Sequence, residues 1–256
     1  MCLIVFALDC HPRYKLVLAA NRDEFYQRPT QTAAFWPERP DVLAGKDLLK
    51  MGTWLGITKT GRFAALTNYR DPSQNKHGAP SRGLLVYNYL IGQDAPDDYL
   101  RRLVGTAQQY DGYNLLAGTT SALYYFSNQE QAVRQIQPGI HGLSNSLLNV
   151  CWPKVNRSVR QMKDCLLDDV IQEDRLFRIM ADKQQAPDHE LPRTGVSLEW
   201  ERLLSSIFIA GEDYGTRCTS VLLVDRSNHV QFWEKSFKFG NQEDADMVSY
   251  EFSVEG

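Results

Sequence analysis

Apolar residues form short continuous runs near the start of the chain. The runs 2–8 and 14–20 are separated by a turn at His11-Pro12-Arg13, a pattern typical of a hairpin of two buried strands. Neither run alternates with polar residues, so we expect both to be central antiparallel strands of a sheet. The same pattern predicts further strands at 53–58, 62–68, 113–119, 122–127, 132–136, 217–225, 229–235 and 247–254.

The middle of the chain changes to helical spacing. Apolar positions three and four residues apart predict helices at 81–91, 96–109, 153–171, 174–183 and 197–208. The segment 21–28 is predicted to be a charged loop that stops at Pro29, and 138–145 to be rich in turns. Strands at both ends with helices between them do not fit a repeating βαβ plan. The pattern favours an α+β fold, with two antiparallel sheets covered by helices on their outer faces.

Composition narrows the class of protein. The chain has 256 residues, 43% hydrophobic and 23% charged, which is typical of a globular protein, and we expect one domain over residues 1–256. A net charge of −3 gives no general attraction to nucleic acid. No apolar run is long enough for a membrane span, so stable membrane insertion is not expected. The five cysteines show neither disulfide nor metal-site spacing, which favours a reducing, cytoplasmic compartment.

Cys2 is the first candidate for chemistry. Removal of Met1, which the small second residue permits, would leave a thiol and a free α-amine on one residue. An α-amine has a pKa of about 7.7–8.0 and a free cysteine one of about 8.5, so the amine can accept the thiol proton at neutral pH. Such a residue is nucleophile and base at once. The alternative is that Cys2 is a small buried residue at the start of a strand.

Polar residues at the ends of predicted strands form a second set of candidates. Asn21, Arg22, Asp23 and Glu24 follow the second strand, and the hairpin returns them towards Cys2. The alternative interpretation of this quartet is a solvated turn. Asn68, Asn145 and Arg217 also lie at strand ends. Asparagine amides donate to oxyanions, and arginine binds carboxylate or phosphate.

The combination resembles the N-terminal cysteine hydrolases, the group of bile-salt hydrolase and penicillin V acylase. It resembles still more the transport and Golgi organisation protein 2, or NRDE, family. The stretches that carry the second resemblance are MCLIVF, LAANRDEFYQRP, GTWLGIT, RFAALTNYRDP, RGLLV, GLSN, YGTR and the closing YEF. The resemblance implies a four-layer αββα sandwich of the N-terminal-nucleophile hydrolase type.

The resemblance to the hydrolases implies catalytic roles for Cys2, Asp23, Asn68, Asn145 and Arg217. In those hydrolases an arginine precedes the aspartate by a few residues, whereas Arg22 and Asp23 are adjacent here. Whether Asp23 or Glu24 faces Cys2 therefore stays open.

Two functions follow from these residues and from the family. The chain could be an N-terminal cysteine amidohydrolase or acyl-transferase, with Cys2 attacking an amide or thioester. The NRDE family is also associated with haem trafficking and acyl-coenzyme A handling, which implies a carrier with the same pocket. Haem would then be bound as cargo, and no cofactor would be required. Its ligand-binding residues would be Asn21, Arg22, Glu24, Trp54, Tyr69 and His141, with Arg22 or Arg217 holding the anionic ends. A protein-interaction domain is the third alternative, and it does not explain the polar residues at the strand ends.

Overall fold

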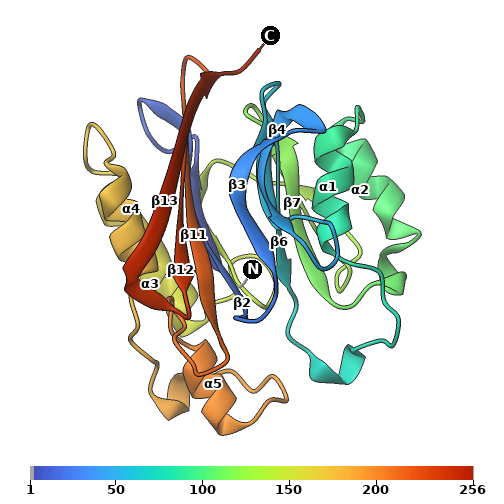
Figure 1. Ribbon diagram of the computed structural model, residues 1–256, viewed down its shortest axis with the longest axis vertical. Helices are drawn as coiled ribbons and strands as arrows, with labels where there is room; N and C mark the ends of the chain where they lie inside the picture. The colour runs from blue at the N-terminus through green and yellow to red at the C-terminus, as the bar shows by residue number, and fades with distance from the viewer. Residues whose placement is uncertain (1–2, 256) are drawn as a thin grey trace.

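Two antiparallel sheets face each other in the computed structural model, which describes residues 3–255 (Figure 1). In the described residues, the strands of the first sheet have the order β10-β1-β2-β11-β12-β13. These strands are Leu3–Leu8 (β1), Tyr14–Phe25 (β2), Gly139–Leu143 (β10), Tyr214–Asp225 (β11), His229–Lys238 (β12) and Asn241–Ser253 (β13).

The second sheet has the strand order β3-β4-β5-β6-β7-β8-β9 within the same described range. Its strands are Thr30–Trp36 (β3), Arg39–Asp47 (β4), Leu55–Thr58 (β5), Arg62–Asn68 (β6), Tyr113–Thr119 (β7), Leu123–Ser127 (β8) and Val133–Gln135 (β9). The chain passes from the first sheet to the second directly after β2, so β2 and β3 bring the two sheets together at one end.

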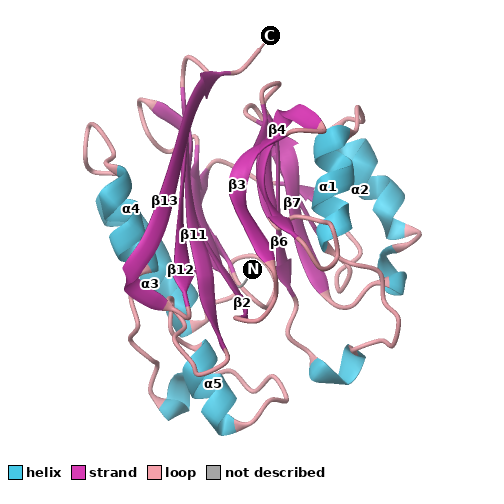
Figure 2. Cartoon of the chain, viewed as in Figure 1, coloured by secondary structure: helices cyan, strands magenta, loops and turns pink. Residues whose placement is uncertain are grey.

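Helices cover the outer face of each sheet and complete four layers (Figure 2). The helices are Gly83–Ile91 (α1), Pro96–Val104 (α2), Pro153–Cys165 (α3), Glu173–Met180 (α4) and Leu198–Leu204 (α5). The helices α1 and α2 pack on the second sheet, and α3 and α4 pack on the first. One apolar core fills the space between the sheets, and two others lie under the helices. The predicted four-layer αββα sandwich is confirmed.

The first hairpin is as the sequence predicts. The strands β1 and β2 pair antiparallel, from Leu3 opposite Asn21 to Leu8 opposite Leu16. Every residue of β1 is buried, because a helix layer covers one face and the second sheet covers the other. Continuous apolar runs, and not alternating ones, are the expected sequence of strands buried on both faces.

Several predicted boundaries are wrong. The helices predicted at 96–109 and 197–208 end at Val104 and Leu204, and the strand predicted at 247–254 begins at Asn241. Three further differences concern 21–28, 138–145 and 153–171. The segment 21–28 is not a loop throughout, because β2 continues to Phe25 by pairing with β11, where Asp23 lies opposite Thr216. The turn-rich segment 138–145 contains β10, which pairs with β1. The helix predicted at 153–171 ends at Cys165, and Leu167 beyond it is 82% exposed. The strands β3 and β4 were not predicted.

Across residues 3–255 we find no helix whose length and apolar content would let it cross a membrane.

Candidate functional site

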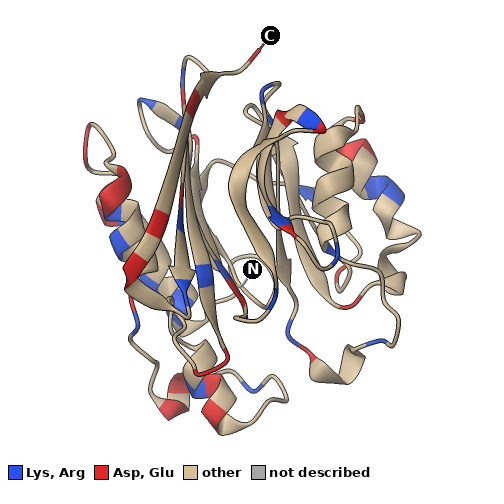
Figure 3. Cartoon of the chain, in the orientation of Figure 1, with Lys and Arg blue, Asp and Glu red and all other residues tan. Residues whose placement is uncertain are grey.

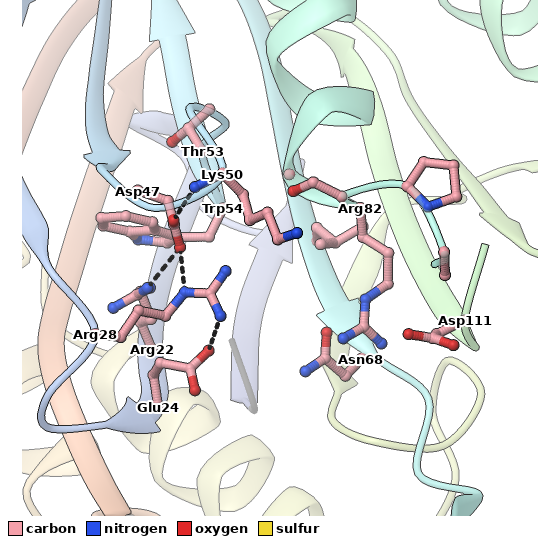
Figure 4. A pocket seen from close by; sticks show the side chains of 15 residues that line it. Arg22, Glu24, Arg28, Asp47, Lys50, Thr53, Trp54, Asn68, Arg82 and Asp111 are labelled. Carbon is pink, nitrogen blue, oxygen red and sulfur yellow. Dashed lines mark hydrogen bonds and ion pairs between the residues drawn. The ribbon is translucent and has the colours of Figure 1, made fainter. Parts of the chain in front are cut away.

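A cleft of about 220 Å³ lies between the sheets at the end of β2. It is lined mainly by charged and polar side chains, and we call it the polar compartment. Its charged residues are Arg22, Glu24, Arg28, Asp47, Lys50, Arg82 and Asp111. Figure 4 shows two groups on opposite sides of the cleft, with Arg22, Arg28, Glu24 and Asp47 on one side and Arg82, Asn68 and Asp111 on the other.

Acidic and basic residues lie side by side at the end of β2 and in the turn to β3 (Figure 3). The Oδ2 atom of Asp47 accepts from Arg22 Nη2 at 3.2 Å and from Arg28 Nε at 2.6 Å. Arg28 Nη1 also lies 3.7 Å from Glu24 Oε2. The four side chains therefore form a row of alternating charge. Because Arg22 belongs to the first sheet and Asp47 to the second, this row also links the two sheets.

Arg22 is held on every side by the protein. It is 4% exposed, its Nη1 donates to Thr30 Oγ1 at 3.1 Å, and its guanidinium lies 4.4 Å from the ring centroid of Trp54. Burial raises the pKa of Asp47, but the hydrogen bond from Arg28 and the charges of both arginines outweigh it, so the pKa lies below its ordinary value. The carboxylate is thus ionised at neutral pH.

A second cavity of about 390 Å³ adjoins the polar compartment, and we call it the aromatic compartment. Its apolar wall consists of Phe25, Tyr69, Val196, Trp200, Leu204 and Tyr214. Asn68 and Arg82 line both compartments, so the two adjoin at these side chains. Phe25 packs edge-on against Tyr214, whose ring lies 5.6 Å from that of Trp200.

The two predicted asparagines meet at this junction. Asn145 Nδ2 donates to the Asn68 carbonyl at 3.0 Å, and Asn145 Oδ1 accepts from Arg70 Nη2 at 3.1 Å. Arg70 in turn forms a buried ion pair with Glu201 of α5, at 3.1 Å. Glu201 Oε1 accepts from both the backbone and the hydroxyl of Thr194, at 2.7 Å each. This network fixes the Asn145 amide and ties α5 to the cleft.

Asn21 and Asp23 point away from the cleft. Side chains alternate along a strand, so when Arg22 faces the second sheet its neighbours face the helices. Asn21 is fully buried, with Nδ2 donating to the carbonyls of Met180 and Ile207 at 2.9 Å each. Asp23 Oδ1 accepts from Thr216 Oγ1 at 2.7 Å. The structure therefore places these two predicted site residues in the layer beneath the helices.

Arg217 lines a different cavity, of about 170 Å³, and Trp54 lines both this cavity and the polar compartment. Its Nη1 donates to the carbonyls of Phe25 and Arg28, at 2.8 and 2.9 Å, and so braces the turn after β2. Burial, and then the charge of Arg22, lower the pKa of Arg217 from its ordinary value.

The wall of this cavity also includes Glu234, a buried carboxyl that accepts from Ala33 N at 2.7 Å and from Ser220 Oγ at 3.0 Å. Burial raises the pKa of Glu234 in spite of these hydrogen bonds.

His141 and Cys2 remain to be placed. His141 lies on β10 and is stacked on Phe6 with 5.1 Å between the ring centroids. Its Nε2 contacts the Gln137 carbonyl and its Nδ1 contacts the Asn149 amide, each at 3.0 Å, and it lies outside both compartments of the cleft. Cys2 lies outside the described residues.

Several residues that line the cleft are not among the site residues predicted from the sequence. Asp47, Lys50 and Arg82 line the polar compartment, and Trp200 and Tyr214 line the aromatic one. Asp47 follows a run that mixes apolar and polar residues, so neither periodicity nor a motif marks it. The signal that could have found Arg82 is its place at the start of the helix predicted at 81–91, where an anion would be stabilised.

Comparison with known proteins places the chain among relatives of similar length. A transport and Golgi organization protein 2 homolog from Bos taurus is 35% identical, and one from Homo sapiens is 34% identical; each alignment covers 100% of this chain and 100% of the relative. The C2A mutant of conjugated bile acid hydrolase from Clostridium perfringens superimposes with a TM-score of 0.53 at 8% identity, over 100% of this chain and 94% of that one.

The likeness to the hydrolase shows that the fold is that of the N-terminal-nucleophile hydrolases. The family model of Transport and Golgi organisation 2 matches residues 1–238. With the full-length relatives, this match confirms the family that the sequence motifs indicated. The chain belongs to the Transport and Golgi organisation 2 family.

Proposed function

We propose that the cleft binds and carries an amphipathic anionic small molecule, namely haem or an acyl-coenzyme A. The observation that carries the proposal is that a charged compartment adjoins an aromatic one, with Asn68 and Arg82 lining both. Ligand sites are typically concave, mainly apolar, and supplied with a few convergent polar groups. A flat or long apolar body would lie against Trp200 and Tyr214, with its anionic end in the polar compartment. We propose the cytoplasm as its location, on the cysteine pattern of the sequence alone.

Lys50 and Arg82 are the cations we assign to the anionic end. Arg22 and Arg28 already share Asp47, so their charges are compensated within the protein. In the described part of the chain, Lys50 Nζ has neither a hydrogen bond nor an ion pair, and its side chain extends into the cleft (Figure 4). Arg82 lines both compartments and therefore stands where the charged and apolar parts of a ligand would join.

Arg82→Ala is expected to weaken the binding of haemin and of palmitoyl-coenzyme A by about tenfold. A hydrogen bond to a charged group contributes about 1.5–3 kcal/mol, and we take the lower end because Arg82 is half-buried. Calorimetric titration of wild type and variant measures the change. The control is Arg101→Ala, which removes an arginine whose side chain is 71% exposed on α2. Equal affinities in the two variants would contradict the assignment.

The hydrolase alternative rests on Cys2 together with the shared fold. Cys2→Ala separates the two functions. A carrier should keep its ligand affinity within about twofold, because a thiol contributes little to binding an apolar body, whereas a hydrolase would lose turnover by orders of magnitude. The measurements are calorimetric titration and hydrolysis of an amide or thioester, with intact mass to show whether Met1 is removed. Turnover by wild type that is absent in Cys2→Ala would replace the carrier proposal with the enzyme.

A further inference from the structure

We propose that Asp47 determines ligand specificity, by occupying the place between Arg22 and Arg28 that an anionic group would otherwise take. The cleft then accepts a singly charged carboxylate end and discriminates against a phosphate end. This inference rests on the proposed function and narrows its ligand class. Three observations carry it: the fixed position of the carboxylate, the engagement of Arg22 and the charge balance of the polar compartment.

The carboxylate of Asp47 is held by four donors. Its Oδ2 accepts from Arg22 Nη2 and Arg28 Nε, while its Oδ1 accepts from the backbone nitrogens of Leu49 and Lys50 at 3.1 and 2.9 Å. The residue is 9% exposed. A ligand therefore cannot displace this carboxylate from the arginines without also breaking the start of the loop that carries Lys50.

Arg22 has few other ways to reach a ligand. Its Nη1 donates to Thr30, and the indole of Trp54 lies against its guanidinium. Asp47 takes the Nη2 donor, and it accepts from Arg28 at the shorter distance of 2.6 Å. Asp47 thus acts as an internal anion in the site, and a bound anionic group has to lie beside it, nearer to Lys50 and Arg82.

The charges of the compartment then decide which anions fit. Its lining has four cationic residues, Arg22, Arg28, Lys50 and Arg82, and three acidic ones, Glu24, Asp47 and Asp111. The formal excess is one positive charge, which one carboxylate neutralises. A phosphate monoester carries a charge of about −1.5 to −2 at pH 7 and would leave uncompensated negative charge beside Asp47. A ligand end with a single carboxylate therefore fits better than one with a terminal phosphate.

Asp47→Asn tests the inference directly. The amide keeps the Oδ1 acceptor for the loop and removes one negative charge. The probes are dodecanoate and dodecyl phosphate, which share an apolar chain, titrated calorimetrically below their micelle concentrations at pH 7.5. We expect wild type to prefer dodecanoate, and the ratio of the two affinities to move about tenfold towards the phosphate in the variant. The control is Asp98→Asn, which makes the same change in net charge at an exposed position on α2 and should leave the ratio unchanged.

The outcomes separate this inference from the proposed function. If both probes bind but wild type prefers the phosphate, or if Asp47→Asn leaves the ratio unchanged, the role of Asp47 is overturned and the cleft still binds amphipathic anions. If neither probe binds wild type or variant, both proposals fail. If Asp47→Asn does not fold, the preference of wild type between the two probes and the variant Glu24→Gln provide the test. Glu24→Gln also raises the formal charge of the compartment by one. It must therefore shift the ratio of the two affinities towards dodecyl phosphate as well.

Discussion

Asn21→Ala is expected to lower the free energy of unfolding by about 3 kcal/mol, although Asn21 is one of the residues predicted to bind the ligand. Its side chain is fully buried, donates to two carbonyls and accepts from Thr219 Oγ1 at 2.6 Å. Each buried polar group left without a partner costs about 1–3 kcal/mol. Truncation leaves the carbonyls of Met180 and Ile207 and the Thr219 hydroxyl without these partners in a buried layer beneath α4.

Denaturant unfolding measures this loss. The matched control is Asn88→Ala, at an exposed position of α1, which should change stability by no more than about 0.5 kcal/mol. The folded Asn21→Ala protein should still bind haemin with wild-type affinity, since Asn21 does not face the cleft. A loss of affinity without a loss of stability would reverse this assignment and restore Asn21 to the ligand site.

The quartet shows what sequence reasoning can and cannot find at a strand end. The place of the quartet near the start of β1, where Asn21 lies opposite Leu3, is predictable because the hairpin register follows from two apolar runs. Which of them face the cleft depends on whether the strand continues. With β2 extended by β11, strict alternation sends Arg22 inwards and Asn21 and Asp23 outwards. A charged loop, as predicted, would have allowed all four side chains to converge.

The remaining parts of the site depend on contacts between distant segments. Asn68 and Asn145, both at strand ends, lie together, with the Asn145 amide donating to the Asn68 backbone carbonyl. The pairing of Arg22 with Asp47 joins two sheets, and no local pattern specifies it. Arg217 was predicted to open a late strand, but β11 begins at Tyr214, and the Arg217 side chain bonds to the turn after β2 and not to the cleft. The sequence indicates that polar residues lie at these strand ends, but it does not specify the partners of their side chains.

Glu201→Ala is expected to cost about 3–5 kcal/mol, because it leaves a buried arginine without its counter-charge. The side chains of Arg70 and Glu201 are 10% and 5% exposed, and removing one partner of a buried ion pair is strongly destabilising. The backbone and hydroxyl of Thr194 lose their acceptor at the same time. In the variant, Arg70 still donates to Asn145 Oδ1 and keeps its cation–π contact with Trp152, whose ring centroid lies 5.0 Å from the guanidinium carbon.

The loss of stability should be greatest in α5, and this local effect distinguishes Glu201→Ala from a substitution in the central core. The helix supplies Trp200 and Leu204 to the aromatic compartment, so its release should weaken ligand binding as well as stability. Hydrogen exchange should rise in 194–204 before it rises in β1 and β2, because the central strands keep all their contacts. Glu199→Ala is the control, an exposed acid on the same helix. If the two variants lose equal stability and α5 exchanges no faster, the Arg70–Glu201 pair does not hold the cleft together, and packing of Leu204 must position the helix instead.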